Sequence, residues 1–177
     1  SAASDVYKRQ DLDIVAINNP SGPETAAYLL KYDTVHGRLN KKVEIDKDDL
    51  IVDGKRIHVF QDRNPENLDW SAYGTEIVIE STGKLKDRES AGKHIRGTVN
   101  KVIITAPGKD EDATIVVGVN ENIYDPAKDD IISNASCTTN CLAPVCKVLN
   151  DTFGIKRGLM TTVHSYTCLL YTSDAAD

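Results

Sequence analysis

Short apolar runs alternate with amphipathic segments along most of the chain. Residues 11–19 are apolar at their centre and closed by polar residues, a pattern typical of a buried parallel strand. Residues 23–33 follow a turn and place apolar side chains at helical spacing. Residues 87–95 also predict a helix. Further strands are predicted at residues 76–82, 101–107, 114–120 and 130–136.

Residues 43–60 have a different pattern, in which short strand-like runs are joined by Asp53 and Gly54. An Asp-Gly pair favours a two-residue hairpin turn. Elsewhere, strands that alternate with helices predict an α/β sheet of the doubly wound type. We therefore interpret the hairpin as an insertion into such a sheet.

A dinucleotide-binding sheet requires a glycine-rich phosphate turn after its first strand, and the chain contains no G-x-G-x-x-G pattern. We therefore expect residues 11–19 to form the second strand of such a sheet. The end of that strand carries the group that meets the adenosine ribose, and Asn18 and Asn19 occupy this place. This interpretation requires the first strand and its glycine turn to lie before residue 11.

The two ends of the chain have the pattern of non-native sequence. Residues 1–10 and 168–177 can be encoded by the two strands of one short DNA sequence, which chance would hardly produce. Both segments are therefore left out of the fold prediction. We expect the remaining residues 11–167 to be the middle of a longer protein.

Composition adds limits on the class of protein. The 177 residues are 40% hydrophobic and 27% charged, with a formal net charge of −6, as in ordinary globular proteins. No apolar run reaches the roughly 18 residues that a membrane span needs, so no membrane partner is expected. No block of Lys and Arg stands out, which argues against a nucleic-acid partner. Four scattered cysteines do not form a disulfide framework and favour a reducing cytosol.

The candidate chemistry lies in the stretch SNASCTTNCLAP, where Cys137 and Cys141 are four residues apart. A helix is predicted to begin at Cys137, with Ser136 as its cap. In the first turn of a helix, unpaired N–H groups and the positive end of the dipole favour a thiolate. Cys141 and Cys146 lie deeper in this helix and are interpreted as small core residues.

A histidine follows this helix in residues 158–167, which alternate like a strand. A short connection would bring His164 back beside Cys137, and a thiol with an imidazole can attack a carbonyl. Other interpretations stay open, because a lone cysteine at a helix start is more often packed than reactive. A zinc site lacks a second pair of ligands, and a disulfide within one helix is not expected. Surface or local hydrogen-bonding roles are predicted for His36, His58 and His94.

These residues resemble a known family. SNASCTTNCLAP and the following KVLNDTFGIKRGLMTTVHSYT closely resemble phosphorylating glyceraldehyde-3-phosphate dehydrogenases. The likeness extends back through AYLLKYDTVHGRLN, DRNPENLDW, IVIESTG, KVIITAPGK and YDPAKDDIISNAS, and covers residues 11–167. It implies a partial Rossmann-type dinucleotide-binding domain at residues 11–136, without its first strand and glycine turn. Residues 137–167 would begin an α+β catalytic domain.

The resemblance implies a reaction and the residues for it. Cys137 would attack the aldehyde of D-glyceraldehyde 3-phosphate, and His164 would take up the proton as hydride leaves for NAD. Inorganic phosphate would release the thioester as 1,3-bisphosphoglycerate, in glycolysis or gluconeogenesis. The family's substrate-binding positions match Ser136, Cys137, Thr138 and Thr167. Its cofactor-binding positions match Asn19, Arg63, Thr82, Gly83 and Thr105, and it implies no metal.

Alternatives remain for some of these positions. Thr82 and Gly83 could form only a strand-end turn, and Arg63 could be a solvated charge. Asn19 departs from the family pattern, in which NAD-preferring members usually have Asp. A carboxylate would repel a 2′-phosphate, whereas an amide can donate to one. We therefore expect NADP as a second cofactor, with Ser21 as a further phosphate contact.

The resemblance also implies a homotetramer in the cytoplasm or in a plastid. The chain alone is expected to be inactive and poorly folded, because a parallel sheet without its first strand exposes apolar edges and the catalytic domain is incomplete. The sequence leaves two other functions open. One is an erythrose-4-phosphate dehydrogenase of the same fold, and the other is a non-catalytic binding module.

Overall fold

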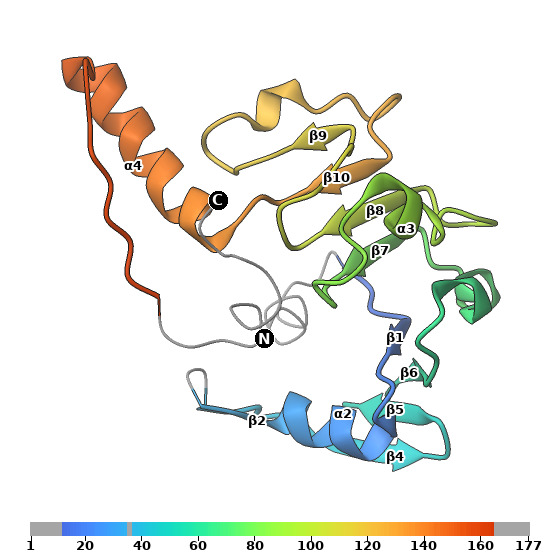
Figure 1. Cartoon of the computed structure of the whole chain (residues 1–177). Coiled ribbons are helices and arrows are strands. Elements are labelled where there is room, and N and C mark those ends of the chain that lie inside the picture. The colour runs from blue at the N-terminus through green and yellow to red at the C-terminus, as the bar shows by residue number, and fades with distance from the viewer. Residues whose placement is uncertain (1–11, 35–36, 165–177) are drawn as a thin grey trace. The chain divides into compact units, whose positions relative to one another are not determined.

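The computed structural model describes residues 12–34 and 37–164, which form two compact units (Figure 1). The first unit contains the described residues up to Glu76 together with Lys93–Val99. The second contains Ile77–Gly92 and the described residues from Asn100 onward. Each unit has its own four-stranded sheet.

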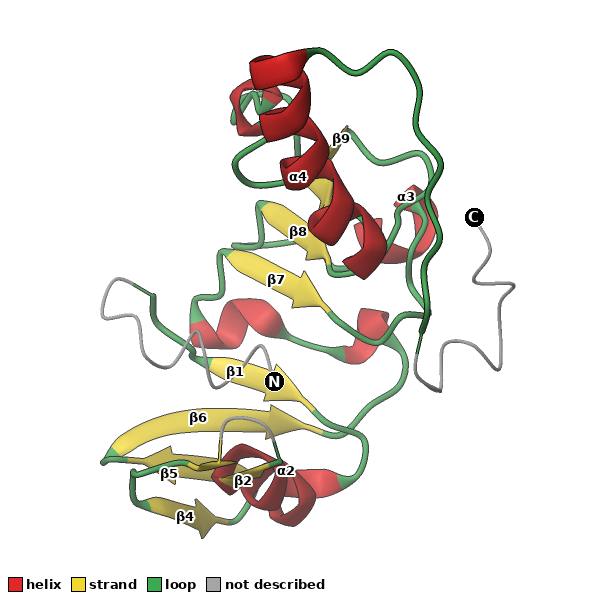
Figure 2. Ribbon diagram, turned by 90° about the vertical axis from the view of Figure 1, so that its left-hand side faces the viewer, coloured by secondary structure: helices red, strands yellow, loops and turns green. Residues whose placement is uncertain are grey.

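The first unit has the strand order β1-β6-β5-β4 (Figure 2). β1 pairs in parallel with β6, whereas β5 pairs in antiparallel fashion with both β6 and β4. Two short strands, β2 and β3, pair with each other. In chain order the elements are β1 (Ala16–Asn18), α2 (Gly22–Lys31), β2 (Tyr32–Asp33), β3 (Gly37–Arg38), β4 (Val43–Asp46), β5 (Asp49–Val52), β6 (Lys55–Phe60) and the 3-10 helices Pro65–Asn67 and Trp70–Tyr73.

The hairpin predicted within residues 43–60 is confirmed. Asp53 and Gly54 connect β5 to β6 with φ angles of 50° and 84°. Positive φ at both central residues is the conformation of a type I′ turn, whose twist matches that of the flanking strands. The inward faces of the strands pack against α2, and this core consists of Ala26, Leu50, Val52, Ile57 and Val59.

The second unit has the order β7-β8-β10-β9, with all neighbouring strands parallel. Ala91, Val102, Ile104 and Ile131 are its most deeply buried aliphatic residues. β7 has only β8 as a neighbour among the described strands, and its Ile77 and Ile79 are about half exposed. The elements are β7 (Ile77–Glu80), α3 (Arg88–Gly92), β8 (Lys101–Ile104), β9 (Ala113–Thr114), the 3-10 helix Glu121–Ile123, β10 (Ile131–Ser133) and α4 (Cys137–Phe153).

Several predicted elements are shorter than expected. The strand at residues 114–120 is wrong beyond Thr114, because Asn120 folds back on the chain. Its amide donates to the carbonyl of Thr114 at 3.0 Å and accepts from the N–H of Val116 at 2.8 Å. These bonds replace the ladder bonds that a continued strand would need. The helix predicted at residues 87–95 is confined to α3.

The strand predicted at residues 158–167 is also wrong over its described part. Residues 158–164 have no regular secondary structure, and their side chains are exposed. A strand needs a neighbour for its N–H and C=O groups, and none of the described strands pairs with this segment.

The predicted α/β class with parallel pairing is confirmed. β4 and β5 lie between β1 and β6 in the chain and extend the sheet beyond β6 in antiparallel fashion. The predicted insertion is limited to these two strands, because β6, the second strand of the hairpin, is itself the parallel neighbour of β1. None of the helices in the described part of the chain combines the length and apolar character needed to cross a membrane.

Candidate active site

The start of α4 is defined by its cap. The Oγ of Ser136 accepts a hydrogen bond from the N–H of Thr139 at 3.0 Å, as predicted for a capping residue. The helix ends at Gly154, whose φ of 72° lies in the left-handed region. Cys137 is the first residue of α4 and is exposed. The first turn carries no acidic residue that would neutralise the positive end of the dipole.

The side chain of Asn140 ties the second turn of α4 to the segment before it. Its Nδ2 donates to the carbonyl oxygen of Asn134 at 2.7 Å and to that of Ser136 at 2.9 Å. Asn140 follows Cys137 and both acceptors precede it, so these bonds tie together the backbone on the two sides of the cysteine. Asn140 is not among the residues predicted from the sequence, although an Asn on the first turns of a capped helix is a signal for such a contact.

His164 lies beside the first turn of α4. Its Nε2 is 3.3 Å from the Oγ1 of Thr138 and 3.1 Å from the Oγ1 of Thr162. After α4 the chain runs back along the helix as an extended segment, seen in red in Figure 1. His164 therefore returns to the first turn of this helix without the predicted strand. It contacts Thr138 and Thr162 there, and its predicted pairing with Cys137 stays a prediction. Thr167 lies outside the described residues.

The other cysteines differ from the prediction. Cys141 is exposed and Cys146 is partly exposed, so neither is a core residue in this unit. No residue of α4, all of which is described, is buried. Cys137, Cys141 and Cys146 are free thiols. Among the described residues, no group of three or more His, Cys, Asp or Glu side chains could hold a metal ion.

Three of the predicted cofactor residues lie at the carboxyl edge of the second unit's sheet. Glu80, the last residue of β7, is buried, and its Oε1 accepts from the N–H of Thr82 at 2.7 Å. The N–H of Thr105, just after β8, donates to the carbonyl of Glu80 at 3.0 Å. Gly83 follows with a φ of 69°. Ligands of α/β sheets bind at this edge, so the positions of these residues fit a cofactor.

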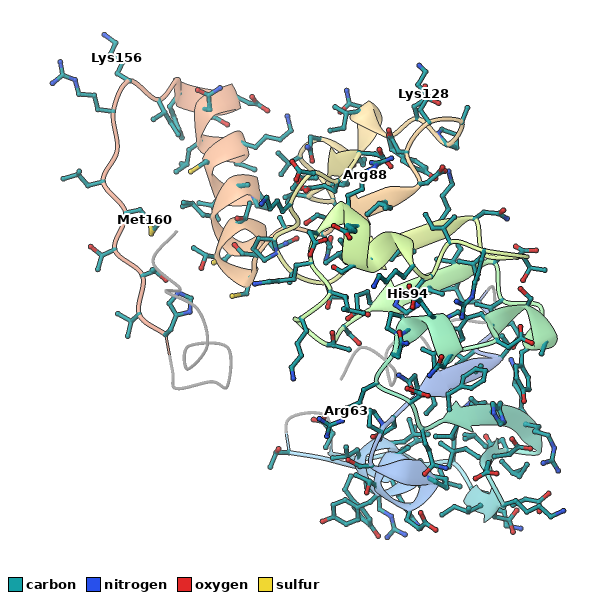
Figure 3. The ribbon with its side chains drawn as sticks, turned by 45° about the vertical axis from the view of Figure 1, so that its right-hand side comes forward. Arg63, Arg88, His94, Lys128, Lys156 and Met160 are labelled. Atoms are coloured by element: carbon teal, nitrogen blue, oxygen red, sulfur yellow. The ribbon has the colours of Figure 1, made fainter. Side chains whose placement is uncertain are left out.

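The remaining two predicted cofactor residues follow the parallel pair of the first unit. β1 ends just before Asn19 and β6 ends three residues before Arg63, so both lie past the carboxyl ends of these strands. Asn18 joins the two loops, because its Nδ2 donates to the carbonyl of Asp62 at 2.8 Å. The Oδ1 of Asn19 accepts from the N–H of Ser21 at 3.0 Å. Arg63 is exposed (Figure 3).

Comparison with known proteins decides the family. Residues 1–88 match the family described as "Glyceraldehyde 3-phosphate dehydrogenase, NAD binding domain". Residues 136–176 match "Glyceraldehyde 3-phosphate dehydrogenase, C-terminal domain". The chain belongs to the glyceraldehyde-3-phosphate dehydrogenase family. The resemblance found in the motifs is thereby confirmed.

Individual members of the family are similar over most of the chain. A glyceraldehyde-3-phosphate dehydrogenase of Geobacillus stearothermophilus is 56% identical over 160 residues, which are 90% of this chain and 48% of the relative. Glyceraldehyde-3-phosphate dehydrogenase 1 of Bacillus cereus is 55% identical over 157 residues, 89% of this chain and 47% of the relative. The chain therefore spans about half the length of the curated relatives it matches.

Proposed function

We propose that the protein containing this chain oxidises D-glyceraldehyde 3-phosphate to 1,3-bisphosphoglycerate, with NAD as cofactor and inorganic phosphate as co-substrate. The observation that carries the proposal is the exposed Cys137 at the first position of α4 with His164 beside that turn, in a member of this family. A thiol and an imidazole in this arrangement suit covalent catalysis on an aldehyde.

Cys137 and His164 divide the chemistry between them. The thiolate of Cys137 adds to the carbonyl carbon, and the imidazolium of His164 gives a proton to the oxygen, forming a thiohemiacetal. In the oxidation His164 takes that proton back as the C–H bond breaks. When bound, NAD would accept the hydride in this step. Phosphate attack on the thioester then frees the Cys137 thiolate.

The binding residues follow from the same positions. Ser136, Thr138 and Thr167 would hold the substrate and its phosphate groups. Thr82, Gly83 and Thr105 would contact the cofactor from the second unit's sheet edge. The exposure of Thr82 and Thr105 at a carboxyl edge supports this role. Asn19 and Arg63 would contact its adenosine half.

Asn19 supports NADP as an additional cofactor. Its Oδ1 accepts from the Ser21 N–H, so the amide Nδ2 is the group that can donate to a 2′-phosphate. We expect Asn19→Asp to lower the turnover ratio of NADP to NAD, because the carboxylate would repel the phosphate. Asn18→Asp is a poor control because Asn18 joins two loops, so Asn122→Asp, at an exposed position of the second unit, serves instead. An unchanged ratio in Asn19→Asp contradicts this part of the proposal.

Activity assays on the intact protein test the main proposal. Cys137→Ser should abolish phosphate-dependent reduction of NAD, whereas Cys141→Ser, the matched control four residues later, should retain it. Equal activity of the two variants would contradict the assignment. Erythrose 4-phosphate, assayed in parallel, distinguishes the alternative dehydrogenase. The 177-residue chain alone is expected to be inactive, and the intact protein to be a homotetramer by light scattering.

A further inference from the structure

Ser133 is a buried polar residue to which the proposed reaction gives no role. It is the last residue of β10, and its exposed fraction is 0%. Its hydroxyl donates to the carbonyl of Ala106 at 2.8 Å. The same oxygen accepts from the N–H of Gly108 at 3.1 Å and from the N–H of Ala135 at 3.0 Å. One donor and two acceptor positions are therefore all in use.

The partners of Ser133 belong to two different loops. Ala106 and Gly108 lie in the loop after β8, which begins with Thr105. Ala135 lies in the turn that leads from β10 to Cys137. The loop after β8 approaches the end of β10 so closely that a Cβ at Gly108 would lie 3.1 Å from the Cβ of Ser133. A single hydroxyl thus joins the loop that carries a proposed cofactor residue to the turn that carries the proposed nucleophile.

The turn before α4 has a backbone conformation that needs such support. Ala135 has a φ of 56°, in the left-handed region that side chains with a Cβ rarely adopt. It is also buried, at 7% exposure, and its N–H is one of those held by Ser133. Without that acceptor the turn can relax toward ordinary φ values, and the capping residue Ser136 moves with it.

We propose that Ser133 is a positioning residue, whose hydroxyl fixes the turn that carries Cys137 against the loop that carries Thr105. It acts through the backbone of Ala135 and Gly108. The inference rests on the proposed function only for the roles of Cys137 and Thr105. The hydrogen bonds and the strained turn do not depend on it.

The test uses Ser133→Ala in the intact protein, with two measurements. Each cysteine is alkylated with iodoacetamide near pH 7, and the rates are read by mass spectrometry, with Cys141 as an internal reference. We expect the ratio of the Cys137 rate to the Cys141 rate to fall by about ten-fold, toward that of ordinary thiols. Val102→Ala, a core truncation in the same sheet, is the matched control and should leave this ratio unchanged.

Hydrogen–deuterium exchange gives the second measurement. The amides of Gly108 and Ala135 should lose protection in Ser133→Ala, while those of β8 keep theirs. An unchanged cysteine ratio with unchanged Gly108 and Ala135 protection overturns the inference, and so does an equal fall of the ratio in Val102→Ala. If Cys137 of the parent chain reacts no faster than Cys141, the proposed nucleophile is contradicted instead, and amide exchange alone decides the role of Ser133.

Discussion

Asp112, the residue just before β9, joins the beginning of β10 to the beginning of α3. Its Oδ2 accepts from the backbone N–H groups of Asp130 and Ile131, both at 2.9 Å, and its Oδ1 pairs with the guanidinium of Arg88. The side chain is only 16% exposed. A hydrogen bond to a charged group contributes about 1.5–3 kcal/mol. In Asp112→Ala the Asp130 N–H can bind water in place of the carboxylate, which offsets part of the loss. We therefore expect Asp112→Ala to lower the free energy of unfolding of this unit by about 3 kcal/mol, less than the sum over all three partners.

The effect of Asp112 should depend on pH. Burial acts to raise the pKa of Asp112, but the Ile131 N–H, Arg88 and the Asp130 N–H outweigh burial and lower it. A carboxyl with a lowered folded pKa stabilises the fold above its unfolded value of about 3.9, and this contribution is lost as the pH falls through the folded pKa. The difference in unfolding free energy between the parent and Asp112→Asn should therefore be full at neutral pH and shrink below about pH 4.

Native-state hydrogen exchange measures both effects. The amide of Val102, which donates to the carbonyl of Asp130, reports opening of the whole sheet. Glu121→Gln changes an exposed carboxyl in the same unit and is the control. If Asp112→Ala speeds exchange at Ile131 but leaves Val102 unchanged, Asp112 supports one bond and not the unit. A pH-independent difference between the parent and Asp112→Asn would refute the electrostatic reasoning.

Three further changes test the local structure. Gly54→Ala should destabilise the hairpin by about 1 kcal/mol because of its φ of 84°, whereas Gly158→Ala, at an open position, should be neutral in urea unfolding. Trp70→Phe removes the buried hydrogen bond from the indole N–H to His94 and should lower the free energy of unfolding of the first unit by about 2 kcal/mol. Unfolding is read by circular dichroism, because the variant lacks the single Trp of the chain and its fluorescence. Ser136→Ala should lower the stability of the start of α4 by about 1 kcal/mol, read as faster exchange of the Thr139 amide.

Local signals made part of the fold predictable from the sequence. The Asp53-Gly54 pair specifies a turn by its own backbone preference, so the hairpin was predicted correctly. Ser136 and Gly154 mark the two ends of α4 in the same local way. The position of Cys137 in the first turn follows directly from them. The short connection after α4 predicted that His164 returns toward that turn, where it contacts Thr138.

Contacts between distant segments could not be predicted in this way. The apolar residues 114–120 have strand propensity, but the side chain of Asn120 turns the chain after Thr114. Residues 158–164 alternate like a strand, yet alternation does not supply a pairing partner. The role of Ser133 could not be predicted from a sequence motif, because it depends on two loops that meet only in the folded unit.

The most direct test of Cys137 as the nucleophile is a search for its thioester. The intact protein is mixed with glyceraldehyde 3-phosphate and NAD in phosphate-free buffer, quenched in acid and digested for mass spectrometry. The account predicts an acyl adduct on the peptide that carries Cys137, which disappears when phosphate is added. Rapid reduction of NAD with Cys137 unmodified, or an adduct on Cys141 alone, would contradict it.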